Sequence, residues 1–138
     1  MAAPPKDVNY TFSEREIEQL MTYGEARYHE QGELLTREGE SHADCLVTLS
    51  GETHIFVERA EGPLRVGWME RGQFSGDITI LTGQATLAKT IMGVAGEVLH
   101  IPHQQFQRLL VDNSPLSDVF VRTLTARREF GRASGVSG

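Results

Sequence analysis

Residues 45–58 read CLVTLSGETHIFVE, and this stretch shows on a small scale the pattern that decides the fold. Cys45–Leu49 and Thr53–Glu58 are short runs of residue types that favour strands. Gly51 lies between them, and the gap is too short for the crossover helix that parallel strands need. The stretch therefore predicts two antiparallel strands joined by a turn.

The same alternation of strand-forming runs and glycines extends over Ala26–Ile101. It predicts further strands at Ala26–His29, Leu34–Arg37, Leu64–Met69, Thr86–Met92 and Val98–Ile101. Because no helix-length segment separates consecutive strands, we expect a mainly β domain of the antiparallel sandwich or barrel type.

One helix is expected before the strands. Ser13 is the predicted N-cap, Glu16 completes a capping box, and Phe12 with Ile17 forms a hydrophobic staple. Gly24 is expected to stop the helix. Residues 1–11 lack apolar periodicity and are interpreted as a flexible tail.

Two helices are expected after Pro102. The first presents Phe106, Leu109 and Leu110 on one face and breaks at Asp112 and Asn113. The second takes Ser114 as its N-cap, with Pro115 at the first helical position. Residues 131–138 are interpreted as a flexible tail or the start of a linker, which leaves 12–130 as one domain.

The last helix carries residues of an amphipathic stripe at spacings of three and four: Leu116, Val119, Phe120, Thr123, Leu124 and Arg127. Arg127 and Arg128 suit its far end, where cations offset the helix dipole. We expect part of the stripe to contact a second chain, forming a homodimer, or a downstream domain. Complete packing on the domain itself is the alternative.

Composition excludes several classes of function. The 138 residues include 13 Lys and Arg against 19 Asp and Glu, a formal charge of -6, which disfavours direct DNA binding, and the chain ends before a helix-turn-helix could follow. The only cysteine, Cys45, cannot form an internal disulfide, and no signal peptide is evident, so a cytoplasmic location is expected. No apolar run approaches the roughly 20 residues that span a bilayer.

Catalytic and metal-binding patterns are also lacking. The five histidines (His29, His42, His54, His100 and His103) lack the spacing that would converge three ligands on one ion. We interpret them as surface or hydrogen-bonded residues, and Cys45 as a small buried residue. No serine has a G-x-S-x-G context. The domain is therefore expected to be no enzyme and to need no cofactor or metal.

The segment GQFSGDITILTG, residues 72–83, is the most informative about function. Gly76 and Asp77 could begin a short helical turn whose free backbone N–H groups attract an anion. A carboxylate beside that turn can accept hydrogen bonds from sugar hydroxyls. The alternative is that Asp77 only caps the turn and Gly76 only permits it.

Gly72-x-Phe74, then Gly76-Asp77 and an apolar run to Gly83, resembles the phosphate-binding cassette of the cyclic-nucleotide-binding domain family. Glu30-x-Gly32-Glu33-Leu34-Leu35, Glu38-Gly39, Leu46 to Gly51 and Glu97-Val98-Leu99 resemble its other markers. The likeness spans roughly residues 12–130. It implies an antiparallel double-stranded β-helix, the jelly roll or β-roll, with one N-terminal and two C-terminal helices. It also implies a regulatory, ligand-sensing role.

The cassette departs from the family pattern in three places. Ser75 is an extra residue, Asp77 replaces the usual glutamate, and Thr86 stands where the resemblance places the arginine that pairs with the phosphate. Such an arginine contact is worth about 1.5–3 kcal/mol, so weak or absent cAMP binding is expected. Lys89 could approach the same pocket as a point charge or could simply be solvated.

We expect a cyclic nucleotide or another small anion to bind at Gly76, Asp77, Ile78, Thr86, Leu87 and Lys89. Ser75-Gly76-Asp77 and Ala126-Arg127-Arg128-Glu129-Phe130 resemble a divergent subgroup joined to thioredoxin-reductase-like flavoproteins. That likeness implies an excised domain, with the flavin and dinucleotide sites beyond Gly138. The alternative function is a roll that has lost its ligand and serves dimerisation or docking of a fused oxidoreductase. A metal-dependent cupin enzyme is a third reading, which the histidine spacing disfavours.

Overall fold

The computed structural model describes residues 9–40, 43–76 and 88–133. In chain order they form α1 (Glu14–Met21), β1 (Glu25–His29), β2 (Leu34–Thr36), β3 (Cys45–Thr48), β4 (Glu52–Arg59), β5 (Gly62–Met69), β6 (Phe74–Ser75), β7 (Lys89–Val94), β8 (Gly96–Ile101), α3 (His103–Asp112) and α4 (Ser114–Ala133). Every strand pair within the described residues is antiparallel, which confirms the predicted class.

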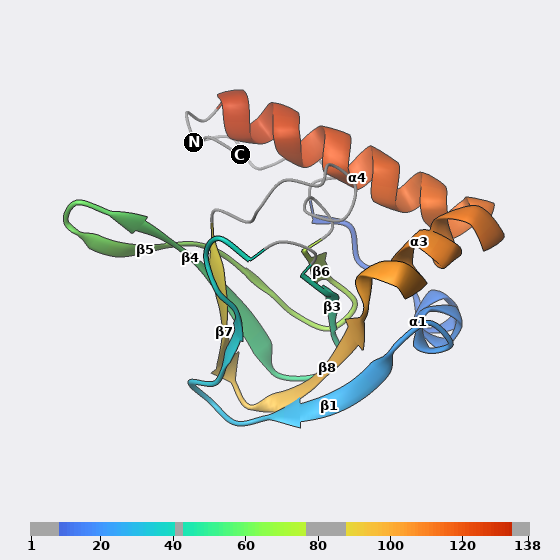
Figure 1. Cartoon of the computed structure of the whole chain (residues 1–138), viewed down its shortest axis with the longest axis horizontal. Coiled ribbons are helices and arrows are strands. Elements are labelled where there is room, and N and C mark those ends of the chain that lie inside the picture. Colours follow the sequence, from blue (N-terminus) through green and yellow to red (C-terminus); the bar gives the residue numbers. More distant parts are fainter. Residues whose placement is uncertain (1–8, 41–42, 77–87, 134–138) are drawn as a thin grey trace.

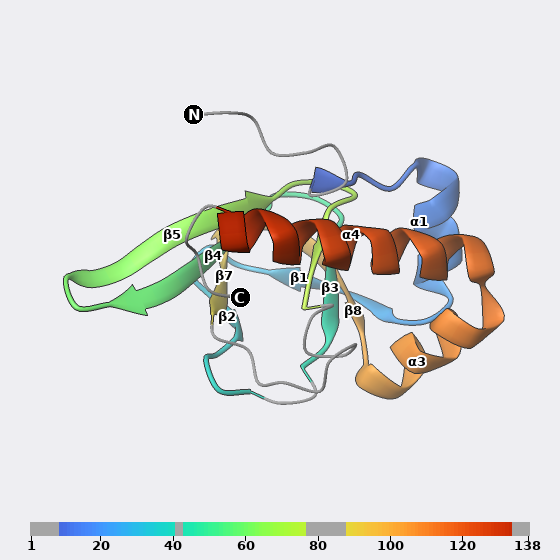
Figure 2. The same cartoon turned by 90° about the horizontal axis from the view of Figure 1, so that it is seen from above.

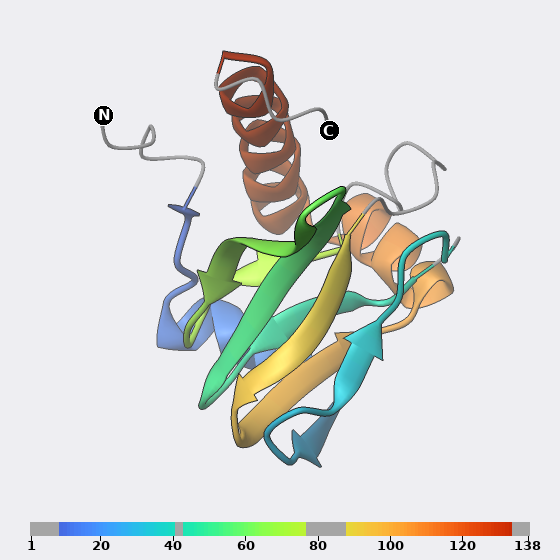
Figure 3. The same ribbon diagram turned by 90° about the vertical axis from the view of Figure 1, so that its left-hand side faces the viewer.

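The strands form two layers. One sheet has the order β1-β8-β3-β6 and the other β2-β7-β4-β5, and Figure 3 shows the second sheet in front of the first. Helices α1 and α3 lie at one end of the roll, and the β4–β5 hairpin extends from the other (Figures 1 and 2). Helix α4 runs back from α3 towards that hairpin. The predicted antiparallel roll with one N-terminal and two C-terminal helices is confirmed.

The main core lies between the helices and one face of the β1-β8-β3-β6 sheet. At its centre Phe120 of α4 meets Phe74 and Phe106, with ring centroids 4.7 Å apart in each pair. Its buried members are Phe12, Ile17, Leu20, Cys45, Val47, Leu49, Phe74, Leu99, Ile101, Phe106, Leu109, Leu116, Val119 and Phe120. A second, smaller cluster contains Leu46, Met92 and Val98, on the opposite face of that sheet.

The first helix begins as predicted. The Ser13 side chain accepts from the Glu16 N–H, and the Glu16 carboxylate accepts from the Ser13 N–H. It ends earlier than expected, because Thr22 is the C-cap. Gly24 has a different role from the predicted stop: a Cβ there would lie 2.3 Å from the His100 carbonyl oxygen, so its lack of a side chain allows close packing on β8.

The last helix begins differently from the prediction. Asn113, not Ser114, is its cap, since the Asn113 side-chain oxygen accepts from the Leu116 N–H and its carbonyl accepts from the Ser117 N–H. The helix also continues to Ala133, so Arg127 lies inside it rather than in its last turn. At the other end of the chain, the Tyr10 hydroxyl donates to Glu16.

The stripe of the last helix is packed on its own domain. Leu116, Val119, Phe120 and Leu124 are at most 8% exposed. The expectation that part of this stripe contacts a second chain is therefore wrong for these four residues. In the described part of the chain no helix is long and apolar enough to cross a membrane.

Candidate functional site

The predicted ligand segment begins at the end of β6. Gly76 has φ +89°, a left-handed conformation that favours glycine, and a Cβ there would lie 2.5 Å from the Asp44 carbonyl oxygen. The segment thus starts in direct contact with the backbone that enters β3. Asp77, Ile78, Thr86 and Leu87 lie outside the described residues, so their predicted roles remain predictions.

Lys89 is the first residue of β7, in the other sheet, so the chain between Gly76 and Lys89 passes from one sheet to the other. Thr90 and Met92 are buried, whereas Lys89 is partly buried and pairs with Phe56 on β4. Because side chains alternate along a strand, Lys89 belongs to the face opposite that of Thr90 and Met92. Its predicted role as a ligand-binding charge stays untested.

Arg127 joins α4 to the strand that leads into this segment. Its guanidinium donates a 2.8 Å hydrogen bond to the Phe74 carbonyl oxygen and lies 4.5 Å from the centre of the Phe74 ring. A cation over an aromatic face is attracted by the ring quadrupole, in addition to the hydrogen bond. The last helix and β6 are therefore held together two residues before Gly76.

Thr123 lies one turn before Arg127 on the same side of α4. It is 1% exposed, and its hydroxyl has no hydrogen-bond partner among residues 9–40, 43–76 and 88–133. A buried hydroxyl without a partner costs free energy, so it is a natural contact for a bound polar group. By contrast, Thr125 on the exposed side of the helix donates to the Val121 carbonyl.

The sequence pattern predicts no binding role for Thr123 or Arg127. Both belong to the stripe expected on the last helix, and the helix dipole accounts for Arg127 there. The sequence did contain one indication: two positions of the apolar stripe are occupied by polar residues. Only the structure shows that both lie on the side of α4 that contacts β6.

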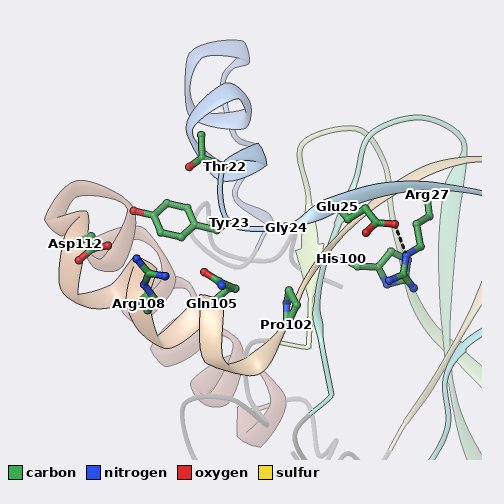
Figure 4. A pocket seen from close by; sticks show the side chains of 10 residues that line it. All are labelled: Thr22, Tyr23, Gly24, Glu25, Arg27, His100, Pro102, Gln105, Arg108 and Asp112. Carbon is green, nitrogen blue, oxygen red and sulfur yellow. Dashed lines mark hydrogen bonds and ion pairs between the residues drawn. The ribbon is translucent and has the colours of Figure 1, made fainter.

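A separate pocket of about 600 Å³ lies between the end of α1, the start of β1 and α3 (Figure 4). Its walls carry charges of both signs: Glu25 and Arg27 form an ion pair on β1, and Arg108 and Asp112 line the opposite wall on α3. His100 also lines it. Among the described residues, neither β6 nor β7 contributes to the lining of this pocket.

His29, His54 and His100 form hydrogen bonds or ion pairs. Among residues 9–40, 43–76 and 88–133, no three potential ligands come together around one point. His29 and His100 contact each other, and His54 contacts Glu52 at 3.0 Å. Cys45 is fully buried, as predicted.

Comparisons with known proteins agree with this geometry. Residues 26–113 match the family described as the cyclic nucleotide-binding domain. A search of curated proteins found no match. Among solved structures, the chain resembles the catabolite activator protein of Thermus thermophilus, with a TM-score of 0.74, 17% identity, and coverage of 95% of this chain and 62% of that protein.

Two further structures show the same fold. A transcriptional regulator from Thermotoga maritima has a TM-score of 0.70 and 20% identity, with 86% of this chain and 92% of that one covered. The c-di-GMP responsive global regulator CLP of Xanthomonas campestris has a TM-score of 0.64 and 19% identity, with 84% and 64% covered. The chain thus spans under two thirds of the first and third of these proteins.

Proposed function

This chain belongs to the cyclic nucleotide-binding domain family, and from that premise we propose that it is a ligand-sensing regulatory domain of a larger protein. Its ligand is a nucleotide or another small anion bound between residue 76 and residue 89, beneath α4. The fusion to a thioredoxin-reductase-like flavoprotein and the cytoplasmic location are parts of the same proposal. The buried lone cysteine, Cys45, agrees with a reducing compartment.

The observation that carries this proposal is the pair of polar groups that α4 directs towards β6. The Thr123 hydroxyl is buried and has no partner in the part of the chain that the structure describes, and Arg127 connects the helix to Phe74. A ligand in the segment after Gly76 could satisfy the first and displace the second. Binding would then change how α4 sits on the roll, which is the output expected of a sensor.

The ligand need not be cAMP. Thr86 stands where the family resemblance places the phosphate-pairing arginine, so we expect cAMP to bind more weakly than micromolar. The Xanthomonas regulator is described as responsive to c-di-GMP, which gives a second anionic candidate on this fold.

Calorimetry with cAMP, cGMP and c-di-GMP tests the proposal. We expect Thr86→Arg to tighten binding of a cyclic nucleotide by about ten- to a hundredfold, because a charge-assisted contact is worth about 1.5–3 kcal/mol. Micromolar cAMP binding by the unmodified chain would contradict the argument from Thr86.

Thr123→Val, with Thr125→Val as its matched control, tests the role of α4. Removing the Thr123 hydroxyl should weaken a bound nucleotide about two- to tenfold and should stabilise the free chain by about 1 kcal/mol, since an unpaired buried hydroxyl disappears. Thr125→Val should leave affinity unchanged, because that hydroxyl is on the exposed side.

The second candidate function is a ligand-free dimerisation or docking domain. Leu64, Val66 and Trp68 of edge strand β5 are 40–50% exposed. A register shift at Val66 places Leu64 and Trp68 on different faces of the strand, so its apolar side chains are exposed on both faces. Exposed apolar residues on an edge strand are typical of a contact surface. If none of the three nucleotides bound to the chain or to Thr86→Arg, this candidate would replace the first.

A further inference from the structure

His29 of β1 and His100 of β8 form a close pair inside the roll. Their Nε2 atoms are 2.8 Å apart, and their side chains are 14% and 8% exposed. His100 lies on the same face of β8 as buried Val98. The rings therefore share a hydrogen bond in a place where water has little access.

A carboxylate lies behind each ring. Glu33 Oε2 is 3.5 Å from His29 Nδ1, and Asp44 Oδ2 is 3.6 Å from His100 Nδ1. The Glu30 N–H also donates to the same Glu33 oxygen, which fixes that carboxylate. The four groups form one chain of contacts: carboxylate, imidazole, imidazole, carboxylate.

The number of hydrogens on the ring nitrogens decides whether all contacts in this series of four side chains can form. The central contact needs one hydrogen, and each Nδ1 needs one to face its carboxylate, so three hydrogens satisfy the four ring nitrogens. Two neutral imidazoles have two, and one further proton completes the set. A fourth hydrogen would place two N–H groups against each other on two positively charged rings.

Other charged side chains are arranged around the pair at greater distance. On β1, Arg27 is two residues from His29 and is ion-paired with Glu25, which is opposite His100 in the strand register. On α3, Arg108 and Asp112 line the pocket to which His100 also contributes (Figure 4). Within the described residues, Glu33 and Asp44 are the ones that form ion pairs with the two rings.

The pKa of His29 is shifted in the direction that disfavours a fourth ring hydrogen. Burial, and then the charge of His100, lower the pKa of His29 below its ordinary value, while Glu33 opposes the shift. A histidine whose pKa is lower in the folded chain makes folding less favourable as the pH falls below about 6.5, the ordinary value.

Asp44 links the pair to the predicted ligand segment. Its side chain contacts His100, and its carbonyl oxygen is the atom against which Gly76 packs. We propose that His29 and His100 act as an acid-sensitive brace behind Gly76: uptake of a fourth ring hydrogen breaks the Nε2···Nε2 hydrogen bond and loosens the contact between Asp44 and Gly76. The proposal does not depend on any ligand.

Urea unfolding of the 138-residue chain between pH 7.5 and pH 5 provides the first test. The folded-to-unfolded ratio of the unmodified chain should fall further than that of His29→Gln, because the lowered pKa of His29 makes the folded chain bind fewer protons than the unfolded chain in this range. His54→Gln is the matched control, since it removes a His–Glu contact without a second histidine. The His54→Gln chain should lose stability at low pH as the unmodified chain does.

An NMR titration of the unmodified chain provides the second test and does not require any variant to fold. The His29 ring signals should titrate below about pH 6.5, and the Gly76 amide signal should change over the same pH range. A His29 ring that titrates at its ordinary value would overturn the brace. A Gly76 amide signal that does not change with the His29 titration would overturn the link to the ligand segment.

Discussion

Gly76 and Gly39 have similar backbone conformations, with φ of +89° and +81°, but different surroundings. A Cβ at Gly39 would meet nothing within 4 Å, whereas one at Gly76 would lie 2.5 Å from the Asp44 carbonyl oxygen. Backbone strain should cost Gly39→Ala about 1–2 kcal/mol. Gly76→Ala should cost a further 1–3 kcal/mol or so from overpacking.

Urea unfolding of the two variants measures that difference. Gly39→Ala serves as the control because it carries the strain without the clash. Equal losses in the two variants would show that the close approach of Gly76 to Asp44 contributes nothing to stability.

Single residues were predictable where their surroundings are local. The Ser13–Glu16 capping box spans three residues, and Cys45 lies in an apolar run, so both were read correctly from the sequence. The His29–His100 pair joins residues 71 apart, and the Arg127 contact joins residues 53 apart. The spacing of residues along the sequence cannot predict such long-range contacts, because they depend on how the strands and helices pack together.

Among the elements, the start of α4 offers a test of the corrected cap. Asn113→Ala should destabilise the chain by about 1 kcal/mol, because the Leu116 N–H loses its acceptor. Ser114→Ala should change stability by less than about 0.5 kcal/mol, because Ser114 is exposed and inside the helix. Thermal unfolding of both variants decides between the two caps, and a larger loss in Ser114→Ala would restore the original prediction.

The longer strands could be predicted from the sequence, whereas β6 could not, because β6 is too short. β4 and β5 each have eight residues, enough for composition and turn residues to identify a strand. β6 has only Phe74 and Ser75, which pair with Val47 and Leu46 on β3. Two residues cannot display a period, so the strand exists through its tertiary partner. The cassette pattern around it was read from family resemblance instead.

At the scale of the whole molecule, α4 covers its own roll, and this changes where a second chain could bind. The stripe residues Phe120 and Leu124 are 0% and 8% exposed, so they belong to the core. Val121 on the outer side of the helix is 49% exposed, and apolar side chains of edge strand β5 are also exposed. A dimer seam on this chain would therefore use Val121 rather than the predicted stripe.

Two substitutions at neighbouring positions of α4 separate the core from such a seam. Phe120→Glu should unfold the chain, because a charge would replace a fully buried ring whose truncation alone costs about 3–5 kcal/mol. Val121→Glu should leave folding stability within about 0.5 kcal/mol and convert dimers to folded monomers, as measured by light scattering with circular dichroism as the folding control. A chain that is monomeric without substitution would exclude a seam altogether, and a chain that remains dimeric as Val121→Glu would exclude α4 and point to edge strand β5.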